Sequence, residues 1–297
     1  MSAPTRPALR WHGGKWLLAP WIIGFFPPHR IYVEPFGGAA SVLLRKPRSY
    51  GEIYNDLDSE VVNLFRVLRS PADAERLVWS LRITPFARDE FALAYEWALD
   101  PAEQARRLVV RSFMGFGSDG HNRLVTTGFR SNANRAGTTP AHDWMNYPDA
   151  LEMTVERLRG VVIENRPAIK VMAHHDSPET LHYVDPPYLP TTRSQKSRKS
   201  GERYHTYTHE MSAADHYELL QFLNGASGMV VLSGYPAPLY EEALTGWERH
   251  EREALADGAR PRTEVVWLNP ACVAARALAA KPQAAVIAHP DLFTFGG

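Results

Sequence analysis

The stretch His182-Tyr183-Val184-Asp185-Pro186-Pro187-Tyr188 decides how the rest of the chain is interpreted. Leu181 to Val184 is a short apolar run of the kind that forms a buried strand. Two prolines follow, and because proline cannot donate to a sheet ladder, the strand must stop there. An acid and an aromatic residue therefore follow the carboxyl end of a strand, which is where open α/β sheets bind their ligands.

The tetrapeptide Asp185 to Tyr188 suits transfer to a planar exocyclic amine, whose nitrogen is a poor nucleophile because its lone pair is delocalised into the ring. The carboxylate of Asp185 and the carbonyl of Pro186, whose direction Pro187 fixes, are two acceptors for the N–H bonds. They are placed where positive charge develops. Tyr188 offers a flat ring for stacking. A strand-ending Asp-Pro turn without a catalytic role explains the tetrapeptide equally well.

Composition sets the limits for the whole chain. Its 297 residues are enough for one large or two small domains, and 44% hydrophobic and 22% charged residues are typical of a soluble globular protein. The single cysteine, Cys272, excludes a disulfide framework and a cysteine-based zinc site, and suits a reducing cytoplasm. No apolar run reaches the roughly 18 residues of a membrane span, and residues 1–10 lack the apolar core of a signal peptide.

The formal net charge is zero, which neither supports nor excludes nucleic acid as a partner, since binding needs only a local basic face. Two stretches are locally basic, one from Arg106 to Arg135 and one from Arg193 to Arg203. Between Arg111 and Pro148, arginines and aromatic residues are interleaved in a segment rich in Gly, Ser, Asn and Thr. This composition is typical of a loop-rich nucleic-acid-binding insertion, and a surface loop without a partner is the alternative.

A glycine turn lies near the start of the chain. Residues 31–33 predict a short strand, followed by Glu34-Pro35-Phe36-Gly37-Gly38-Ala39-Ala40-Ser41 and a helix; a second strand then ends at Asn55-Asp56-Leu57-Asp58. Strand, glycine turn, helix, strand and acid in this order indicate an adenosine-bearing ligand. The reason is that free N–H groups at the helix start and an acid after the next strand bind its polar groups. The spacing is not that of a dinucleotide fingerprint.

The remaining pattern predicts the other elements. Helical spacing runs from Ser59 to about Leu108, and further strands are expected at 161–163, 229–235 and 264–269. Contiguous His174, His175 and Asp176 do not predict a metal site, since adjacent residues rarely ligate one ion and no His-Glu-x-x-His motif is present. Aromatic residues of the helical segment are expected in the core: Trp79, Phe86, Phe91, Tyr95 and Trp97.

Taken in order, these motifs resemble the Dam-like (D12 class) DNA adenine-N6 methyltransferases. Trp11-His12-Gly13-Gly14-Lys15 is similar to the family's N-terminal cofactor segment, 34–41 to its glycine-rich cofactor loop, and 55–58 to the acid after its second strand. Asp185-Pro186-Pro187-Tyr188 is similar to the catalytic tetrapeptide, and Val231-Leu232-Ser233-Gly234-Tyr235 to a later core strand. The order of the motifs over nearly the whole chain is more specific than any one of them.

The resemblance implies an α/β, Rossmann-like fold, S-adenosyl-L-methionine as methyl donor, and a flipped adenine in double-stranded DNA as acceptor. It also implies, in a restriction system, a cognate restriction endonuclease as partner. Residues 1–68 and 151–297 would form the catalytic domain, and 69–150 an inserted target-recognition domain. The site residues implied are catalytic Asp185, Pro186 and Tyr188; cofactor-binding Trp11, Lys15, Phe36, Asp56 and Asp185; and DNA-binding Arg111, Arg123, Arg130, Arg135 and Arg193.

One position departs from the family. Ala40 stands where the cofactor loop usually has glycine, and we expect its methyl group to crowd the cofactor or to demand a different turn. This departure keeps a non-catalytic DNA-binding protein of the same fold as a rival interpretation. Cytosine N4 and adenine in RNA are rival acceptors because they offer the same amine geometry. A nicotinamide-dependent oxidoreductase is disfavoured, since nothing after the glycine turn supplies a hydride-transfer site.

Overall fold

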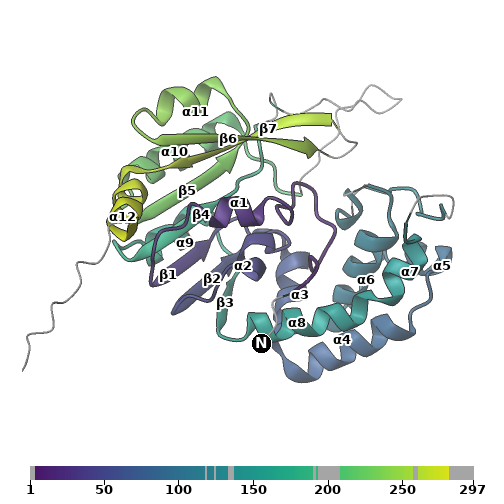
Figure 1. Ribbon diagram of the computed structural model, residues 1–297. Coiled ribbons are helices and arrows are strands. Elements are labelled where there is room, and N and C mark those ends of the chain that lie inside the picture. The colour runs from purple at the N-terminus through teal and green to yellow at the C-terminus, as the bar shows by residue number, and fades with distance from the viewer. Residues whose placement is uncertain are drawn as a thin grey trace, which may run out of the picture.

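The computed structural model describes residues 4–117, 119–123, 125–132, 137–189, 192, 208–256 and 260–280. Within these ranges seven strands form one sheet in the order β3-β2-β1-β4-β5-β7-β6 (Figure 1). β1 to β5 are parallel, and β7 is antiparallel to its neighbours β5 and β6. The strands are β1 (Ile31–Glu34), β2 (Gly51–Asn55), β3 (Val161–Glu164), β4 (Thr180–Val184), β5 (Met229–Gly234), β6 (Glu248–Ala256) and β7 (Arg260–Leu268).

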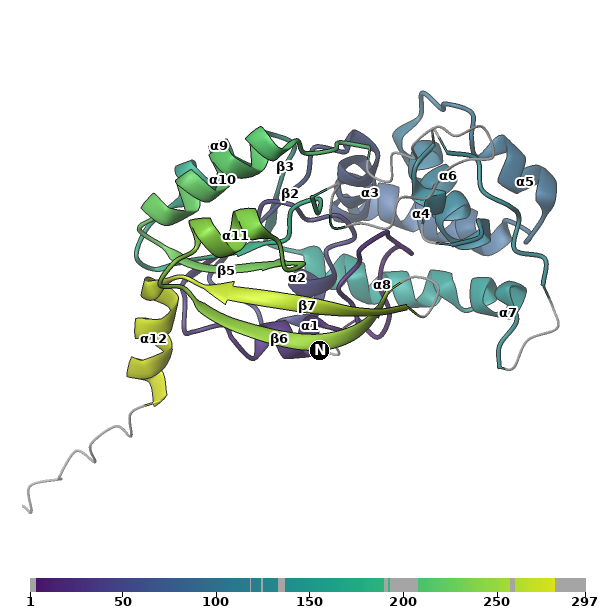
Figure 2. The same cartoon turned by 90° about the horizontal axis from the view of Figure 1, so that it is seen from above.

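Helices cover both faces of the sheet, because alternate residues of its buried strands point to opposite sides. Val33 and Val230 pack with α9 (Ala168–His175), α10 (Ala213–Gly225) and α11 (Pro238–Ala243). Tyr32 and Val231 pack on the other face with α1 (Ala19–Ile23), α2 (Ser41–Arg45) and α12 (Pro270–Ala280). Figure 2 shows α9 and α10 on one side of the sheet and α1 on the other. The α/β fold class predicted from the sequence is confirmed.

A helical body forms between β2 and β3 and lies beside the sheet in Figure 1. Its first helix begins at Asp58, whose carboxylate accepts the backbone N–H of Glu60 at 2.9 Å. α6 packs against α3 and α4, and α8 packs against the same two helices. The predicted helical segment is confirmed, as α3 (Ser59–Arg69), α4 (Pro71–Ile83), α5 (Arg88–Leu93) and α6 (Pro101–Met114); η1 (Asp119–His121), α7 (Pro140–Met145) and α8 (Tyr147–Leu158) follow.

The segment from Arg111 to Pro148 is less open than its composition indicates. Its first residues complete α6 and its last ones begin α8, and its described residues also form η1 and α7. The aromatic rings divide in the same way. Phe113 and Trp144 are 3% and 4% exposed in the core, whereas Phe116 is 72% exposed. Only part of the predicted loop therefore offers aromatic surface.

The core placement of two tryptophans is wrong, and one strand has no counterpart in the sequence prediction. Trp79 and Trp97, assigned to the core, are 59% and 54% exposed, while Phe91 is buried as predicted. The pattern did not predict β6, an edge strand rich in charge, because it lacks the apolar alternation on which strand prediction depends. None of the helices in the described ranges is long and apolar enough to cross a membrane.

Candidate active site

The site lies where the strands β1, β2 and β4 end. Asp185 follows β4, the glycine turn follows β1, and Asp56 follows β2. Because parallel strands end at the same edge of a sheet, these segments meet around one cavity with about 950 Å³ of empty space, open solvent included. Its lining includes Trp11, His12, Lys15, Glu34, Phe36, Gly37, Gly38, Asp56, Asp58, His121, Tyr183, Asp185, Pro186, Pro187 and residues 208–211.

Asp185 is held by contacts to both carboxylate oxygens. Its Oδ2 lies 3.0 Å from the Lys15 ammonium, and Lys15 also donates to the Gly13 carbonyl at 3.0 Å. Its Oδ1 accepts from the Ser233 hydroxyl at 2.9 Å and lies 3.2 Å from the Tyr188 hydroxyl. The Asp185 side chain keeps 16% of its surface exposed at the cavity. The carboxylate is thus oriented from several sides and still reachable.

Tyr188 lies beneath this arrangement rather than in the open cavity. It is 6% exposed, the Lys15 ammonium lies 4.7 Å from its ring centroid, and the Tyr235 ring lies 4.3 Å away. Its hydroxyl is also 3.0 Å from the Glu264 carboxyl. In this structure the ring that was expected to stack on a base is therefore covered by protein.

The glycine turn is packed so closely that larger residues would not fit. A Cβ atom on Gly37 would lie 2.1 Å from the Tyr54 ring, and one on Gly38 would lie 2.5 Å from the indole nitrogen of Trp11. The Gly38 N–H donates to Asp56 Oδ2 at 2.8 Å, and the Asp58 N–H donates to Asp56 Oδ1 at 2.8 Å. Asp56 therefore ties the turn to the end of β2 at the wall of the cavity.

The cavity is acidic. Burial raises the pKa of Glu34 to about 8, against hydrogen bonds from the Tyr32 hydroxyl at 2.6 Å and the Leu43 N–H at 2.9 Å. Burial also raises the pKa of Asp56 to about 6, although two backbone N–H groups oppose the rise. Acidic residues outnumber the one lysine along the described lining, but the raised pKa leaves Glu34 neutral near pH 7, so Glu34 adds no negative charge to the cavity.

Ala40 does not obstruct this cavity. It has φ 53° and ψ 34°, the left-handed conformation in which a glycine is favoured, and is the only non-glycine residue with positive φ among those described. Its side chain is fully buried in the core cluster of the α1–α2 face and does not line the cavity. Its place in the core gives no support to crowding of a cofactor, which stays a prediction; the expectation of a demanding turn fits the observed backbone.

The arginines assigned to DNA behave differently from one another. Arg111 is fully buried, with its guanidinium 2.6 Å from Glu60 and 2.6 Å from the Ala94 carbonyl, so its assignment to DNA is wrong for this structure. Arg123 is about one-third exposed and lies over Trp97. Arg130 is half-buried and donates to the Phe113 carbonyl at 2.9 Å. Arg135 and Arg193 lie outside the described residues.

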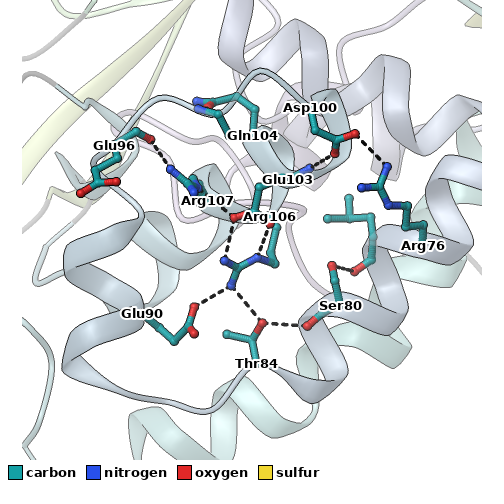
Figure 3. Close-up of polar contacts among 12 residues, drawn as sticks. Arg76, Ser80, Thr84, Glu90, Glu96, Asp100, Glu103, Gln104, Arg106 and Arg107 are labelled. Atoms are coloured by element: carbon teal, nitrogen blue, oxygen red, sulfur yellow. Dashed lines mark hydrogen bonds and ion pairs between the residues drawn. The ribbon is translucent and has the colours of Figure 1, made fainter.

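Much of the basic stretch is neutralised by acids from elsewhere in the helical body. Figure 3 shows Arg106 between Glu103 and Glu90, at 2.7 and 2.8 Å, while Arg107 pairs with Glu103 at 2.8 Å. Arg106 is only 8% exposed. These side chains stabilise the packing of α6 with its neighbours and do not form a basic surface.

Sequence reasoning missed four residues that the fold brings to the site. His121 stacks its ring on Trp11 with centroids 4.0 Å apart, although it belongs to the helical body. Ser233 and Glu264 reach the tetrapeptide from β5 and β7. Thr208 donates to Asp58 at 3.0 Å. Only Ser233 carried a signal, because it stands in a strand-end motif; the others depend on long-range packing.

A family model agrees with this geometry. The model of the D12 class N6 adenine-specific DNA methyltransferases matches residues 11–256. The chain belongs to this family. No curated protein sequence matches the chain significantly. The match runs from Trp11 through the glycine turn and the tetrapeptide to β6, so it includes every element that contributes the motifs of the site.

Membership settles the reaction that the D12 site performs. The enzyme transfers a methyl group from S-adenosyl-L-methionine to N6 of an adenine in DNA, and its fold is that of a Rossmann-like methyltransferase. The residues present fit such a donor, which carries a sulfonium and an ammonium group. Acidic residues line the cavity, and Trp11 and Phe36 supply apolar surface within it.

Proposed function

We propose that Asp185 and the Pro186 carbonyl accept the two N–H bonds of the adenine amine, so that the nitrogen lone pair is free for attack. The observation that supports this most directly is the orientation of Asp185 by Lys15 and Ser233 beside the cavity. Acceptors fixed in advance stabilise the positive charge that develops on the nitrogen without reorganising during the reaction. The nitrogen then loses one proton, for which Asp185 is the nearest carboxylate.

The cofactor would be held by the N-terminal segment and the glycine turn. The bound donor supplies an electrophilic methyl group. Trp11 and Phe36 would pack against it, and Asp56 would accept from its ribose hydroxyls through lone pairs that the two backbone N–H groups leave available. Lys15 would interact with the methionine carboxylate, and this requires the ammonium to share its contact with Asp185.

We also propose that the flipped adenine stacks on Tyr188, which requires a change in the residues that cover the Tyr188 ring. Lys15 and Tyr235 both lie against the Tyr188 ring in this structure. A base can therefore stack on Tyr188 only if one of them moves. The mechanism that we propose therefore includes a movement of Lys15 or Tyr235 when DNA binds.

We further propose that the helical body recognises double-stranded DNA. Exposed Phe116 and the accessible part of Arg123 support this, because an aromatic ring and a guanidinium are suited to bases and phosphates. Arg130, Arg135 and Arg193 are the remaining candidates. A cytoplasmic site of action, and a partner restriction endonuclease if the enzyme belongs to such a system, complete the proposal.

The decisive experiment is methyl transfer from labelled S-adenosyl-L-methionine to mixed-sequence duplex DNA, with Asp185→Asn beside the wild type. We expect N6-methyladenine as the product and a fall of at least about 100-fold in kcat for the variant. Glu179→Gln is the matched control, since this exposed acid precedes the same strand at its other end. An active Asp185→Asn enzyme would sink the proposed role, and N4-methylcytosine or methylated RNA would redirect the substrate.

A further inference from the structure

Glu264 is a buried acid beside the tetrapeptide that none of the roles above uses. It lies on β7, is 7% exposed, and does not line the cofactor cavity. Burial raises its pKa; Lys15 and the hydrogen bond with Tyr188 oppose that rise, and Asp185 adds to it. An acid buried beside another acid is unfavourable unless its proton or its charge has a partner. Glu264 therefore needs a polar partner within the protein.

The hydroxyl group of Tyr188 is the polar partner of Glu264. The Tyr188 hydroxyl has one hydrogen and faces two carboxyl groups, Asp185 Oδ1 at 3.2 Å and Glu264 Oε2 at 3.0 Å. An ionised carboxylate can only accept, so two full hydrogen bonds need a second hydrogen. The phenol can donate its one hydrogen to either carboxyl group; a protonated Glu264 would supply the second by donating to the phenol oxygen, which leaves the phenol hydrogen for Asp185.

The charges of the site agree with this arrangement. Asp185 interacts with the ammonium of Lys15 and with the carboxyl groups of Glu34 and Glu264, and Glu264 also interacts with Lys15. Lys15 is 3.0 Å from Asp185 and balances its charge directly. If Glu34 and Glu264 are neutral, the charges of Lys15 and Asp185 cancel and these four side chains carry no net negative charge. A buried site of low polarity favours this state over one with uncompensated charge.

We propose that Glu264 is a positioning residue for methyl transfer, acting through Tyr188. Its protonated carboxyl holds the phenol so that the phenol proton points at Asp185. Asp185 then keeps the orientation in which it accepts an N–H of the adenine amine. This inference rests on the proposed role of Asp185 and adds β7 to the strands that build the site.

The test compares two substitutions of Glu264. Glu264→Gln keeps an N–H that can donate to the phenol oxygen, so kcat should stay within about twofold of wild type. Glu264→Leu removes the donor, and kcat should fall roughly tenfold, the effect of one lost hydrogen bond. KM for DNA and the cofactor Kd should change little in either variant. A folded Glu264→Gln enzyme as inactive as Glu264→Leu would overturn the proposal, since an ionised Glu264 would then be required.

A double-mutant cycle shows whether the effect passes through Tyr188. In a Tyr188→Phe background, Glu264→Leu should cause no further loss of kcat, because the phenol is already absent. Effects that multiply would overturn the proposal. Glu251→Gln, at an exposed and ion-paired carboxyl of β6, is the control and should behave as wild type.

Two measurements keep the outcome clear. Thermal unfolding reports whether each variant folds, and if Glu264→Leu does not, Glu264→Asp replaces it. The shorter acid cannot reach the phenol, so the same roughly tenfold fall in kcat is expected. Asp185→Asn is assayed in parallel. If that enzyme is active, the proposed role of Asp185 fails whatever the Glu264 variants do, whereas an inactive Asp185→Asn enzyme with a fully active Glu264→Leu enzyme refutes Glu264 alone.

Discussion

Buried charged side chains serve different ends at the carboxyl edge of the sheet and in the helical body. At the sheet edge, Lys15 and Asp185 meet beside the cofactor cavity and remain reachable. In the helical body, Arg106 and Arg111 are enclosed by acids that hold helices together. The sequence of both regions is rich in charged residues, but only at the sheet edge do the buried charges lie at a cavity.

The difference has a topological cause. Residues that follow parallel strands are brought to one edge of the sheet by the strand order itself, so the position of a motif predicts its neighbours. A helix presents its residues to all sides, and which side faces a neighbour depends on packing. The number of arginines in the basic stretch therefore does not show that Arg111 faces Glu60.

Replacing Arg111 should destabilise the fold. Arg111→Met leaves Glu60 without its closest buried cation, and we expect the free energy of unfolding to fall by roughly 3–5 kcal/mol. Chemical denaturation measures it. Arg159→Met, at an exposed arginine paired with Glu156, is the control and should change stability by less than about 1 kcal/mol. A stable Arg111→Met protein that no longer binds DNA would restore Arg111 to the DNA surface.

Replacing Glu34 should change how stability depends on pH. Its folded pKa of about 8 lies above the unfolded value, so Glu34 favours the folded state fully only below the unfolded pKa. Its contribution is lost as pH rises toward 8 and is constant above it. Relative to wild type, Glu34→Gln should therefore gain roughly 2–4 kcal/mol between pH 5 and 8. Denaturation at several pH values checks this, and a constant difference would contradict it.

The surface arginines of the helical body should affect DNA affinity alone. Arg123→Gln and Arg130→Gln should each weaken binding a few-fold and reduce the salt dependence by about one ion. Stability should change little, in contrast to Arg111→Met. Arg76→Gln is the control, because Arg76 is exposed on α4 and paired with Asp100. If both test variants bind DNA as wild type at several salt concentrations, these two side chains are not part of the DNA surface.

The smallest effect is expected at Ala40. Ala40→Gly relieves a left-handed alanine but removes a buried methyl group, so the two terms nearly cancel and stability should change by less than about 1 kcal/mol. The cofactor Kd, measured by calorimetry, should stay within about twofold. Binding that becomes tenfold tighter would show that the methyl group does hinder the cofactor, contrary to its position in the core.

The sequence was most informative where chemical motifs follow one another in a recognisable order along the chain. Trp11, Lys15, Phe36, Asp56 and Asp185 were predicted from motifs, and all of them line one cavity. Predictions from composition alone fared worse. Trp79 and Trp97 were placed in the core because they are aromatic, but helical residues of any type reach the surface when no neighbour covers them.

By itself, then, the sequence determined the α/β class and the order of the motifs, including the tetrapeptide for which we propose a catalytic role. These depend on local patterns, namely apolar runs, glycine turns and the prolines that end β4. Only the tertiary structure decided that Tyr188 lies between Lys15 and Tyr235, that Arg111 is interior, and that Glu264 joins the site. Glu264 lies 76 residues from Tyr188 along the chain, and only the antiparallel insertion of β7 beside β5 brings the two together.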